Sequence, residues 1–208
     1  MTAPLSRSSP FSAFPWVRLA FPRLSLQPMG VRWRRERLPV RCGPGETEKS
    51  LREMARRMLS CYLARHEPAG RVLAVEEPFR LDLSPRIAPV HGRIDLAEAA
   101  PDGQIVVTDF KSAGTRKAPD PAQLVLYREA VRSFSADPDV QVSARFVVLL
   151  KAREPDVVVH EPEIGPADLQ SLTGRYEEVW QPIQSGCSFP VTGWWCGGCQ
   201  WAGHCNAS

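Results

Sequence analysis

The chain has 208 residues, with 26 Lys and Arg side chains against 23 Asp and Glu, and a formal net charge of +3. That length suits one domain with a core of its own, and the near balance of charge excludes a polycationic nucleic-acid binder. No apolar run approaches the roughly 20 residues that cross a bilayer. Residues 1–30 also lack the continuous apolar segment of a secretory signal. We therefore expect a cytoplasmic protein with no membrane partner.

The first 45 residues differ in composition from the rest of the chain. They hold eight arginines and a single acid, Glu36, together with Pro and Ser and no hydrophobic periodicity. We expect a basic, poorly ordered segment over 1–45. Four interpretations stay open: an arm that meets phosphates, a solvated tail, an organellar targeting peptide, or the product of a misplaced start or truncated gene.

Hydrophobic periodicity predicts an α/β succession in the remainder of the chain. Leu51, Met58 and Tyr62 belong to one apolar stripe at helical spacing, and short apolar runs rich in β-branched residues follow. The predicted elements are a helix over 47–64, strands over 71–81, 87–97 and 104–111, a helix over 121–134, strands over 143–151 and 156–160, and a helix over 166–181.

Capping and turn residues refine these boundaries. Thr47 and Ser50 are both candidate starts for the first helix, and Asp120 is a natural N-cap with Pro121 in the first turn. Between the second and third strands, Pro101–Asp102–Gly103 has turn chemistry in which the glycine supplies a positive φ. These two strands are therefore predicted to form a hairpin.

Two carboxylates and a lysine fall on neighbouring predicted strands. Asp95 follows Gly92–Arg93–Ile94, and Asp109 lies two residues before Lys111, on the same strand face. Carboxylates are the hard ligands that Mg²⁺ prefers, and an ammonium beside them can orient a water or stabilise negative charge. The pattern favours metal-assisted attack on a phosphodiester, with the Phe110 carbonyl as a further oxygen ligand.

The helix that follows carries a glutamine and a tyrosine one turn apart. Gln123 and Tyr127 stand at i and i+4, so they share a helix face. Ordinary helix packing is an alternative explanation for the tyrosine. Chance alone would rarely produce the carboxylates, the lysine and this pair in one order, so the whole set indicates a functional site.

Taken together, these segments resemble a known family. Gly92–Arg93–Ile94–Asp95, Asp109–Phe110–Lys111 and Gln123–Leu124–Val125–Leu126–Tyr127 look like the nuclease motifs of the PD-(D/E)XK superfamily, and the RecB/AddB-type exonuclease branch is most similar. The resemblance covers about residues 50–205. It implies a restriction-endonuclease-like α-β-β-β-α-β core, with a central mixed sheet flanked by helices, which agrees with the predicted order of elements.

The resemblance also assigns roles to individual residues. It implies that Asp95 and Asp109 bind Mg²⁺ or Mn²⁺ and that Lys111 is catalytic. It further implies that Gln123 and Tyr127 line the site and touch DNA. The expected activity is that of a Mg²⁺- or Mn²⁺-dependent deoxyribonuclease, an exonuclease on single-stranded or frayed DNA.

Two other positions matter to this resemblance. Glu77 matches a recurring family position, with either a structural role or one near the metal. The branch usually carries a histidine on the first helix in a Gly-x-x-x-His setting, whereas the helix over 47–64 has none. His66 follows that helix and is expected on the surface. The absent histidine leaves a catalytically impaired or truncated DNA-binding module of the same fold as an alternative.

Cysteines crowd the end of the chain, where four of the six fall in the last 22 residues. Such crowding, with a Cys-x₂-Cys pair, favours a metal or a cluster over disulfides. The family resemblance implies a [4Fe–4S] cluster whose ligands are Cys196, Cys199, Cys205 and one more cysteine, with Cys42 favoured and Cys61 and Cys187 as alternatives. Cys187 as the fourth ligand would suit a zinc site equally well, and hence a zinc-stabilised interaction domain.

Three segments are therefore predicted: the basic N-terminal segment over 1–45, a nuclease core over 46–185 and a cysteine-rich, cluster-binding tail over 186–208. The family implies DNA as the partner and recombination or repair at the nucleoid as the setting. It also implies a helicase subunit, or an upstream helicase domain, beside the nuclease.

Overall fold

The computed structural model of the chain describes residues 42–43, 45–187, 190–193, 196–197, 199 and 201–205. The basic segment predicted over 1–45 therefore lies almost wholly outside the described residues. Within them the chain forms two compact units. One unit runs to Leu81 and resumes over His91–Ile164, and the other consists of Asp82–Val90 and the chain from Gly165 onward.

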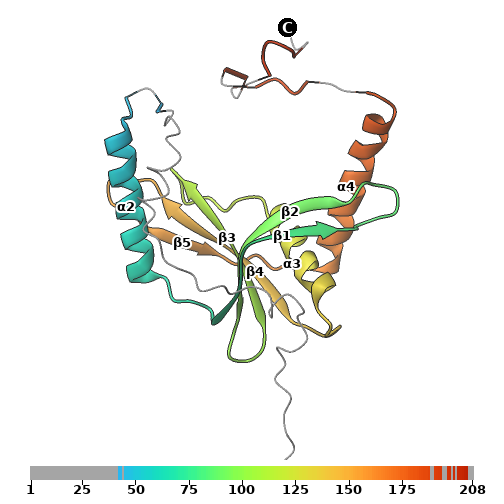
Figure 1. Cartoon of the computed structure of the whole chain (residues 1–208), viewed down its shortest axis with the longest axis horizontal. Coiled ribbons are helices and arrows are strands. Elements are labelled where there is room, and N and C mark those ends of the chain that lie inside the picture. The colour runs from blue at the N-terminus through green and yellow to red at the C-terminus, as the bar shows by residue number, and fades with distance from the viewer. Residues whose placement is uncertain are drawn as a thin grey trace, which may run out of the picture. The chain divides into compact units, whose positions relative to one another are not determined.

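The helices and strands follow the predicted order (Figure 1). They are α2 (Glu48–Arg65), β1 (Arg71–Leu81), β2 (Val90–Ala99), β3 (Ile105–Ala113), α3 (Ala122–Phe134), β4 (Val142–Leu150), β5 (Val157–His160) and α4 (Pro166–Gln184). The second strand begins three residues later than the pattern suggested. A turn in which Ile87 N–H donates to the Ser84 carbonyl precedes it, and Pro89 has no N–H to give to a ladder.

The five strands form one mixed sheet in the order β1-β2-β3-β4-β5. β2 and β3 are antiparallel, β3 and β4 are parallel, and β4 and β5 are antiparallel. The predicted hairpin between β2 and β3 is confirmed, and its turn places Gly103 at φ 91°. The mixed sheet and its flanking helices confirm the predicted α/β class.

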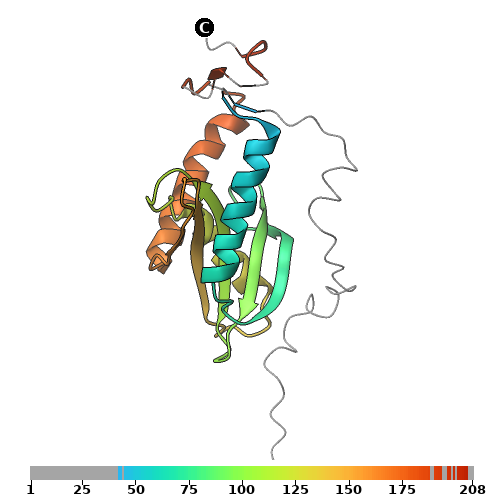
Figure 2. The same ribbon diagram turned by 90° about the vertical axis from the view of Figure 1, so that its left-hand side faces the viewer.

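α2 and α3 cover opposite faces of the sheet. On β3, side chains alternate, so Phe110 and Lys111 point to different faces. The Phe110 ring packs edge-on against Tyr62 of α2, with ring centroids 5.5 Å apart. The Lys111 ammonium instead meets Gln123 of α3. Figure 2 looks onto the face that α2 crosses; we call it the α2 face, and the other the α3 face.

The core lies on the strands and on the inner side of α3. Fully buried apolar side chains come mainly from the central strands and that helix, and they include Leu124, Val131, Ile105, Val107 and Val147. Burial of such side chains is the main force that holds the sheet together, at about 25 cal/mol for each Å² of apolar surface. Strand β3 is buried without interruption from Ile105 to Asp109.

The first helix begins where one of the two candidate signals placed it. The Thr47 hydroxyl accepts the Ser50 backbone N–H at 3.1 Å, while the Ser50 hydroxyl accepts the Thr47 N–H at 2.9 Å, which makes a reciprocal cap. Its apolar stripe is narrower than the spacing suggested, because Met58 is buried whereas Leu59 and Leu63 are exposed. The side of α2 that packs on the sheet is therefore the one that carries Met58 and Tyr62.

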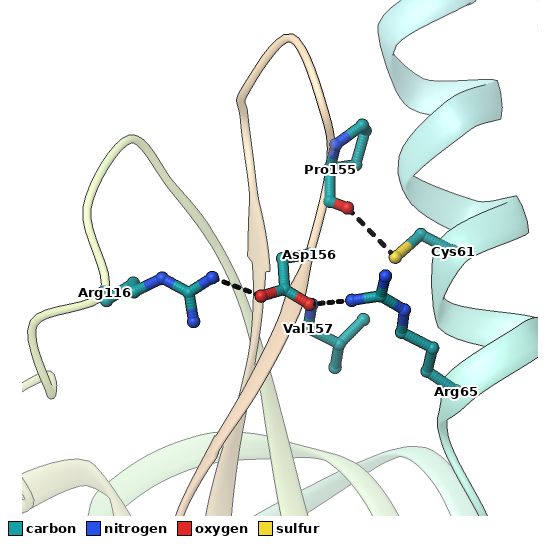
Figure 3. Close-up of polar contacts among 6 residues, drawn as sticks. All are labelled: Cys61, Arg65, Arg116, Pro155, Asp156 and Val157. Carbon is teal, nitrogen blue, oxygen red and sulfur yellow. Dashed lines mark hydrogen bonds and ion pairs between the residues drawn. The ribbon is translucent and has the colours of Figure 1, made fainter.

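A second contact line of α2 is polar and joins the turn between β4 and β5. Arg57 donates to the Arg153 carbonyl at 2.7 Å, and the Cys61 thiol donates to the Pro155 carbonyl at 3.2 Å. One turn further on, Arg65 is ion-paired with Asp156 (Figure 3). The three donors stand at i, i+4 and i+8, so one helix face carries the whole seam.

A buried ion pair lies on the α2 face of the sheet. Glu98 is 1% exposed, and its carboxylate lies 3.3 Å from an Arg145 guanidinium nitrogen. The same guanidinium donates from Nε to the Thr108 hydroxyl at 3.0 Å. Side chains from three neighbouring strands are thus linked on the α2 face. One of them is Thr108, the residue before Asp109. Loss of one partner would leave a buried charge uncompensated.

Arg145→Met is expected to lower the free energy of unfolding by roughly 3–5 kcal/mol, because Glu98 would stay buried without its cation. The double variant Glu98→Leu/Arg145→Met removes both charges and should be clearly less destabilised than the single variant. Urea denaturation followed by circular dichroism measures both. Arg175→Met, an exposed substitution on α4, is the control and should stay within about 0.5 kcal/mol of wild type. Equal losses in the single and double variants would contradict the prediction.

None of the helices in the described part of the chain is long and apolar enough to span a membrane.

Candidate active site

The two predicted metal ligands lie beside each other on the hairpin. Leu96 pairs with Thr108, so continuing the antiparallel register by one residue sets Asp95 opposite Asp109. Side chains directly opposite in an antiparallel pair point to the same face. Both carboxylates therefore occupy the α3 face of the sheet, the face to which Lys111 also points.

Asp109 is a buried carboxylate with little compensation. It is 1% exposed, and neither of its oxygens accepts a well-formed hydrogen bond from the described residues. The Lys111 ammonium does approach Oδ2 to 2.8 Å, which is ion-pair distance although the geometry falls short of a hydrogen bond. Burial raises the pKa of Asp109 and outweighs the lowering by Lys111, and the nearby Asp95 charge raises it further. The Lys111 ammonium therefore compensates the charge of this buried carboxylate only in part.

Asp95 has a different environment. Its Oδ2 accepts the backbone N–H of Phe110 at 2.9 Å, across the hairpin from its own strand. That bond ties the Asp95 side chain to the strand that carries Asp109 and limits its rotation. It uses one oxygen, so the other oxygen remains free to serve as a ligand.

Lys111, Gln123 and Tyr127 form a hydrogen-bonded chain beside the carboxylates. The Lys111 ammonium donates to Gln123 Oε1 at 2.8 Å, and the Gln123 amide donates from Nε2 to the Tyr127 hydroxyl at 2.6 Å. The i, i+4 spacing on α3 therefore does bring the glutamine and tyrosine together, as predicted. The ammonium is held between a carboxylate and an amide oxygen, with its side chain 36% exposed.

Tyr127 is a neutral, ordering member of this chain. It is 5% exposed, and burial raises the pKa of its hydroxyl to about 12, with the Asp109 and Asp95 charges adding to the rise. A phenol with that pKa keeps its proton throughout the neutral range. Tyr127 therefore serves to position Gln123 rather than to exchange protons.

A contact between Phe79 and Tyr127, which the sequence did not reveal, explains why position 92 is a glycine. The Phe79 ring on β1 packs edge-on against Tyr127, with centroids 5.8 Å apart. A Cβ added to Gly92 would lie 2.4 Å from the Phe79 ring, so only glycine lets that ring reach the tyrosine. The apolar Phe79 after Glu77 and Pro78 was the available signal, but nothing in the sequence linked it to Gly92.

Glu77 and His66, the two further positions considered in the sequence, lie outside the hydrogen-bonded chain of Lys111, Gln123 and Tyr127. Glu77 lines a cavity of about 230 Å³ with Ala97 and Phe134. His66 is half-buried rather than a surface residue: it stacks on Tyr62 at 4.6 Å and lies 3.4 Å from Arg145, on the α2 face. Burial and the Arg145 charge lower the pKa of His66. This histidine therefore belongs to the network behind the sheet.

The residues on the α3 face fit a divalent cation. Asp109 offers two buried oxygens without hydrogen bonds, and Asp95 offers one free oxygen beside them. Hard oxygen donors of this kind are what Mg²⁺ and Mn²⁺ prefer, and Mg²⁺ commonly takes only one or two protein carboxylates. No set of three or more His, Cys, Asp or Glu side chains gathers into a metal site among the described residues.

None of the cysteines in the described residues forms a disulfide. In the tail, the Cys196 sulfur accepts the Gly193 N–H at 3.3 Å, and Cys199 N–H donates to the Cys196 carbonyl at 3.2 Å. These bonds form a turn that brings Cys196 and Cys199, the Cys-x₂-Cys pair, near each other. Cys61, an alternative cluster ligand, instead donates to the Pro155 carbonyl. The described cysteines do not assemble a cluster site.

Comparison with known proteins agrees with this geometry. No curated protein matches the sequence. The solved structure of a protein described as "Putative exonuclease", from Eubacterium rectale, has a TM-score of 0.56 and 15% identity, covering 84% of this chain and 67% of that one. That of SSO0001 has a TM-score of 0.42 and 16% identity, covering 76% and 70%.

At 15% identity the first of these structures supports the fold alone. The family is shown by a match of the sequence itself. Residues 14–206 match the PD-(D/E)XK nuclease superfamily, which is nearly the whole chain. The mixed sheet flanked by helices agrees with that match. The chain belongs to the PD-(D/E)XK nuclease superfamily.

Proposed function

We propose that this protein is a metal-dependent nuclease that hydrolyses DNA phosphodiesters at the Asp95–Asp109–Lys111 site. One observation carries the proposal. Asp109 is almost completely buried, has no hydrogen-bonded partner for either oxygen, and has an ammonium 2.8 Å away. A structural carboxylate at that depth would have hydrogen-bonded partners for its oxygens. Here only the Lys111 ammonium stands close, which leaves the carboxylate able to take a cation as a second source of positive charge.

Asp95 and Asp109 would hold Mg²⁺ or Mn²⁺, with the Phe110 carbonyl as a further oxygen ligand. The bound ion would neutralise charge on the phosphate and lower the pKa of a water molecule. The protein's own part is to fix these ligands in place. Asp95 is held by the Phe110 N–H, and Asp109 by the buried strand on which it lies.

Lys111 would act on the attacking water or on the negative charge that develops at the phosphate. Its ammonium is anchored by Gln123 Oε1, and Gln123 is in turn anchored to Tyr127. A cation fixed in advance stabilises developing charge without reorganising during the reaction. Gln123 would therefore be a positioning residue for Lys111, and its exposed side would meet the DNA strand.

The finer function proposed is an exonuclease on single-stranded or frayed DNA in recombination or repair. Family membership and the structural likeness to a protein described as "Putative exonuclease" support this proposal. A helicase, as a separate subunit or an upstream domain, would supply such ends. The proposed setting is the cytoplasm, at the nucleoid.

Lys111→Ala should lower kcat for cleavage of a labelled single-stranded oligonucleotide by about 100–1000-fold, because one preorganised positive group is lost from the transition state. The assay contains Mn²⁺ and uses gel electrophoresis of the products. Lys49→Ala, an exposed lysine in the first turn of α2, is the matched control and should keep wild-type kcat.

The same assay separates the alternatives. If wild-type protein binds the oligonucleotide but never cuts it, the chain is a DNA-binding module that retains the fold and has lost the chemistry. If Lys111→Ala cuts at the wild-type rate, the assigned site is wrong.

Asp109→Asn should raise thermal stability near neutral pH in EDTA, since it removes the cost of burying a charge. The sign follows from linkage. The folded-state pKa of Asp109 lies above its unfolded value, so the folded state binds more protons between the two values. Asp109 therefore costs stability increasingly as pH rises through that window, and fully above it.

The advantage of Asp109→Asn should accordingly shrink as pH falls toward the unfolded value. Differential scanning fluorimetry at several pH values measures it, and added Mn²⁺ should stabilise wild type but not the variant. A variant that is less stable than wild type at neutral pH in EDTA, with no dependence on pH, would count against the assigned charge state.

We further propose that the tail binds a [4Fe–4S] cluster through Cys196, Cys199, Cys205 and Cys42, with Cys187 as the alternative fourth ligand. The Cys-x₂-Cys spacing and the N–H donated to the Cys196 sulfur support it, since such bonds stabilise a thiolate ligand. The cluster would be structural, holding the end of the chain.

Protein purified without oxygen should be brown and contain iron and inorganic sulfide, and Cys196→Ser/Cys199→Ser should lose both. Cys61→Ser is the control, because that thiol bonds to the Pro155 carbonyl, and it should keep the colour. Colourless wild-type protein that contains zinc would instead favour the zinc-stabilised tail. Colourless protein without either metal would contradict both.

A further inference from the structure

A hollow lined with arginines lies between α2 and the turn that joins β4 to β5. Its volume is about 530 Å³. The charged side chains that line it are Arg56, Arg57, Arg65, Arg153 and Glu154. We call this hollow the arginine groove. Its lining carries four guanidinium groups against one carboxylate, and the neighbouring Glu53 and Asp156 carboxylates pair with two of the four.

The seam beneath the groove fixes its walls. Arg57 donates to the Arg153 carbonyl, Cys61 to the Pro155 carbonyl, and Arg65 is paired with Asp156 (Figure 3). These bonds hold the helix and the turn together before any ligand arrives. A ligand that binds there does not have to order either wall, which lowers the entropic cost of binding.

Two of the arginines present their charge outward. The Arg56 side chain is 74% exposed. It donates to both carboxylate oxygens of Glu53, at 2.9 and 3.1 Å, in an exposed ion pair of little strength. Arg153 is also exposed, and the described residues give its guanidinium no ion-pair partner. Its backbone carbonyl, not its side chain, takes part in the seam. The Arg153 guanidinium is therefore open to an external anion, and the Arg56 guanidinium would have to share or exchange its exposed partner, Glu53.

The groove is connected to the strand that carries the active site. Arg116, five residues after Lys111, shares the Asp156 carboxylate with Arg65, one guanidinium from each side (Figure 3). The hydrogen bond from Arg116 holds the pKa of Asp156 below its usual value, so the bridge is charged at neutral pH. The turn is also tied to that strand, because Lys151 N–H donates to the Ala113 carbonyl at 2.7 Å.

We propose that the arginine groove binds the phosphate backbone of a single DNA strand, away from the phosphate that is cleaved. This inference rests on the proposed function. Guanidinium groups bind phosphate oxygens in a two-pronged geometry that suits a polyanion, and the groove offers them on a fixed surface. The proposed nuclease acts on single-stranded or frayed DNA, so a single strand is the occupant we assign to the groove.

The groove lies beside α2, whereas the catalytic side chains point to the α3 face. A strand held in the groove must therefore pass around the end of β3 to reach the site. Affinity should consequently depend on strand length. A short oligonucleotide can occupy the site alone, whereas a longer one can occupy both places.

The test is Arg56→Gln/Arg153→Gln, which neutralises the two groove arginines whose side chains take no part in the seam and so leaves the seam intact. Fluorescence anisotropy in EDTA, where no cleavage occurs, gives Kd for labelled oligothymidines of about 20 and about 5 nucleotides, and for a duplex of the longer length. For the longer strand, Kd should rise about 10-fold, and the slope of log K against log salt should shrink by about 1.4, at 0.7 for each lost phosphate contact. Kd for the short strand should not change.

The matched control is Arg132→Gln/Arg175→Gln, which removes the same charge from α3 and α4 and should leave both affinities at wild-type values. An equal loss in the control would mean that net charge, not the groove, attracts DNA, and would overturn the proposal. So would an unchanged Kd for the longer strand, or a loss as large for the duplex as for the single strand.

The outcome stays separate from that of the proposed function. Binding is measured without metal, so a groove that binds DNA in a chain that never cuts would support this inference and reject the nuclease. With Mn²⁺ present, the groove variant should cleave the short strand with wild-type kcat. Cleavage by wild type together with unaltered length dependence in the variant would retain the nuclease and reject the groove.

Discussion

The burial of Asp109 is the constraint around which this unit is arranged. A carboxylate taken out of water costs several kcal/mol unless a cation or donors compensate. Here the strand hides it to 1% exposure, and only the Lys111 ammonium stands close. The enclosing core holds β3 rigidly enough to keep the charge in place, and the unmet need for positive charge is what makes the position suited to a metal ion.

The alternation of β3 separates two kinds of buried charge. On the α2 face, Thr108 lies in a network where Glu98 is matched by Arg145, and that network is complete and structural. On the α3 face, one residue further on, Asp109 is matched only in part. The same strand thus carries a satisfied charge cluster on one side and an unsatisfied one on the other. The first stiffens the backbone, and the second benefits from that stiffness.

Much of this could be predicted from the sequence because the signals were local. The hairpin turn at Asp102–Gly103, the cap at Thr47 and the Gln123–Tyr127 spacing each depend on residues within one turn of one another. The Glu98–Arg145 pair joins residues 47 apart, and a buried arginine has no pattern that distinguishes it from an exposed one. For the same reason Gly92 could be recognised in its motif, but its steric role toward Phe79 could not.

The surroundings of the Lys111 ammonium explain the role of its hydrogen-bond partner, Gln123. In the free protein the ammonium has two partners, Asp109 and the Gln123 amide oxygen. If Asp109 bound a cation, the attraction between that carboxylate and Lys111 would weaken, and two positive charges would face each other. An ammonium held by the carboxylate alone would swing into solvent. Gln123 is itself fixed by a tyrosine that keeps its proton. It gives Lys111 a neutral anchor whose strength does not depend on the charge of Asp109, so the ammonium can stay in place whatever that charge is.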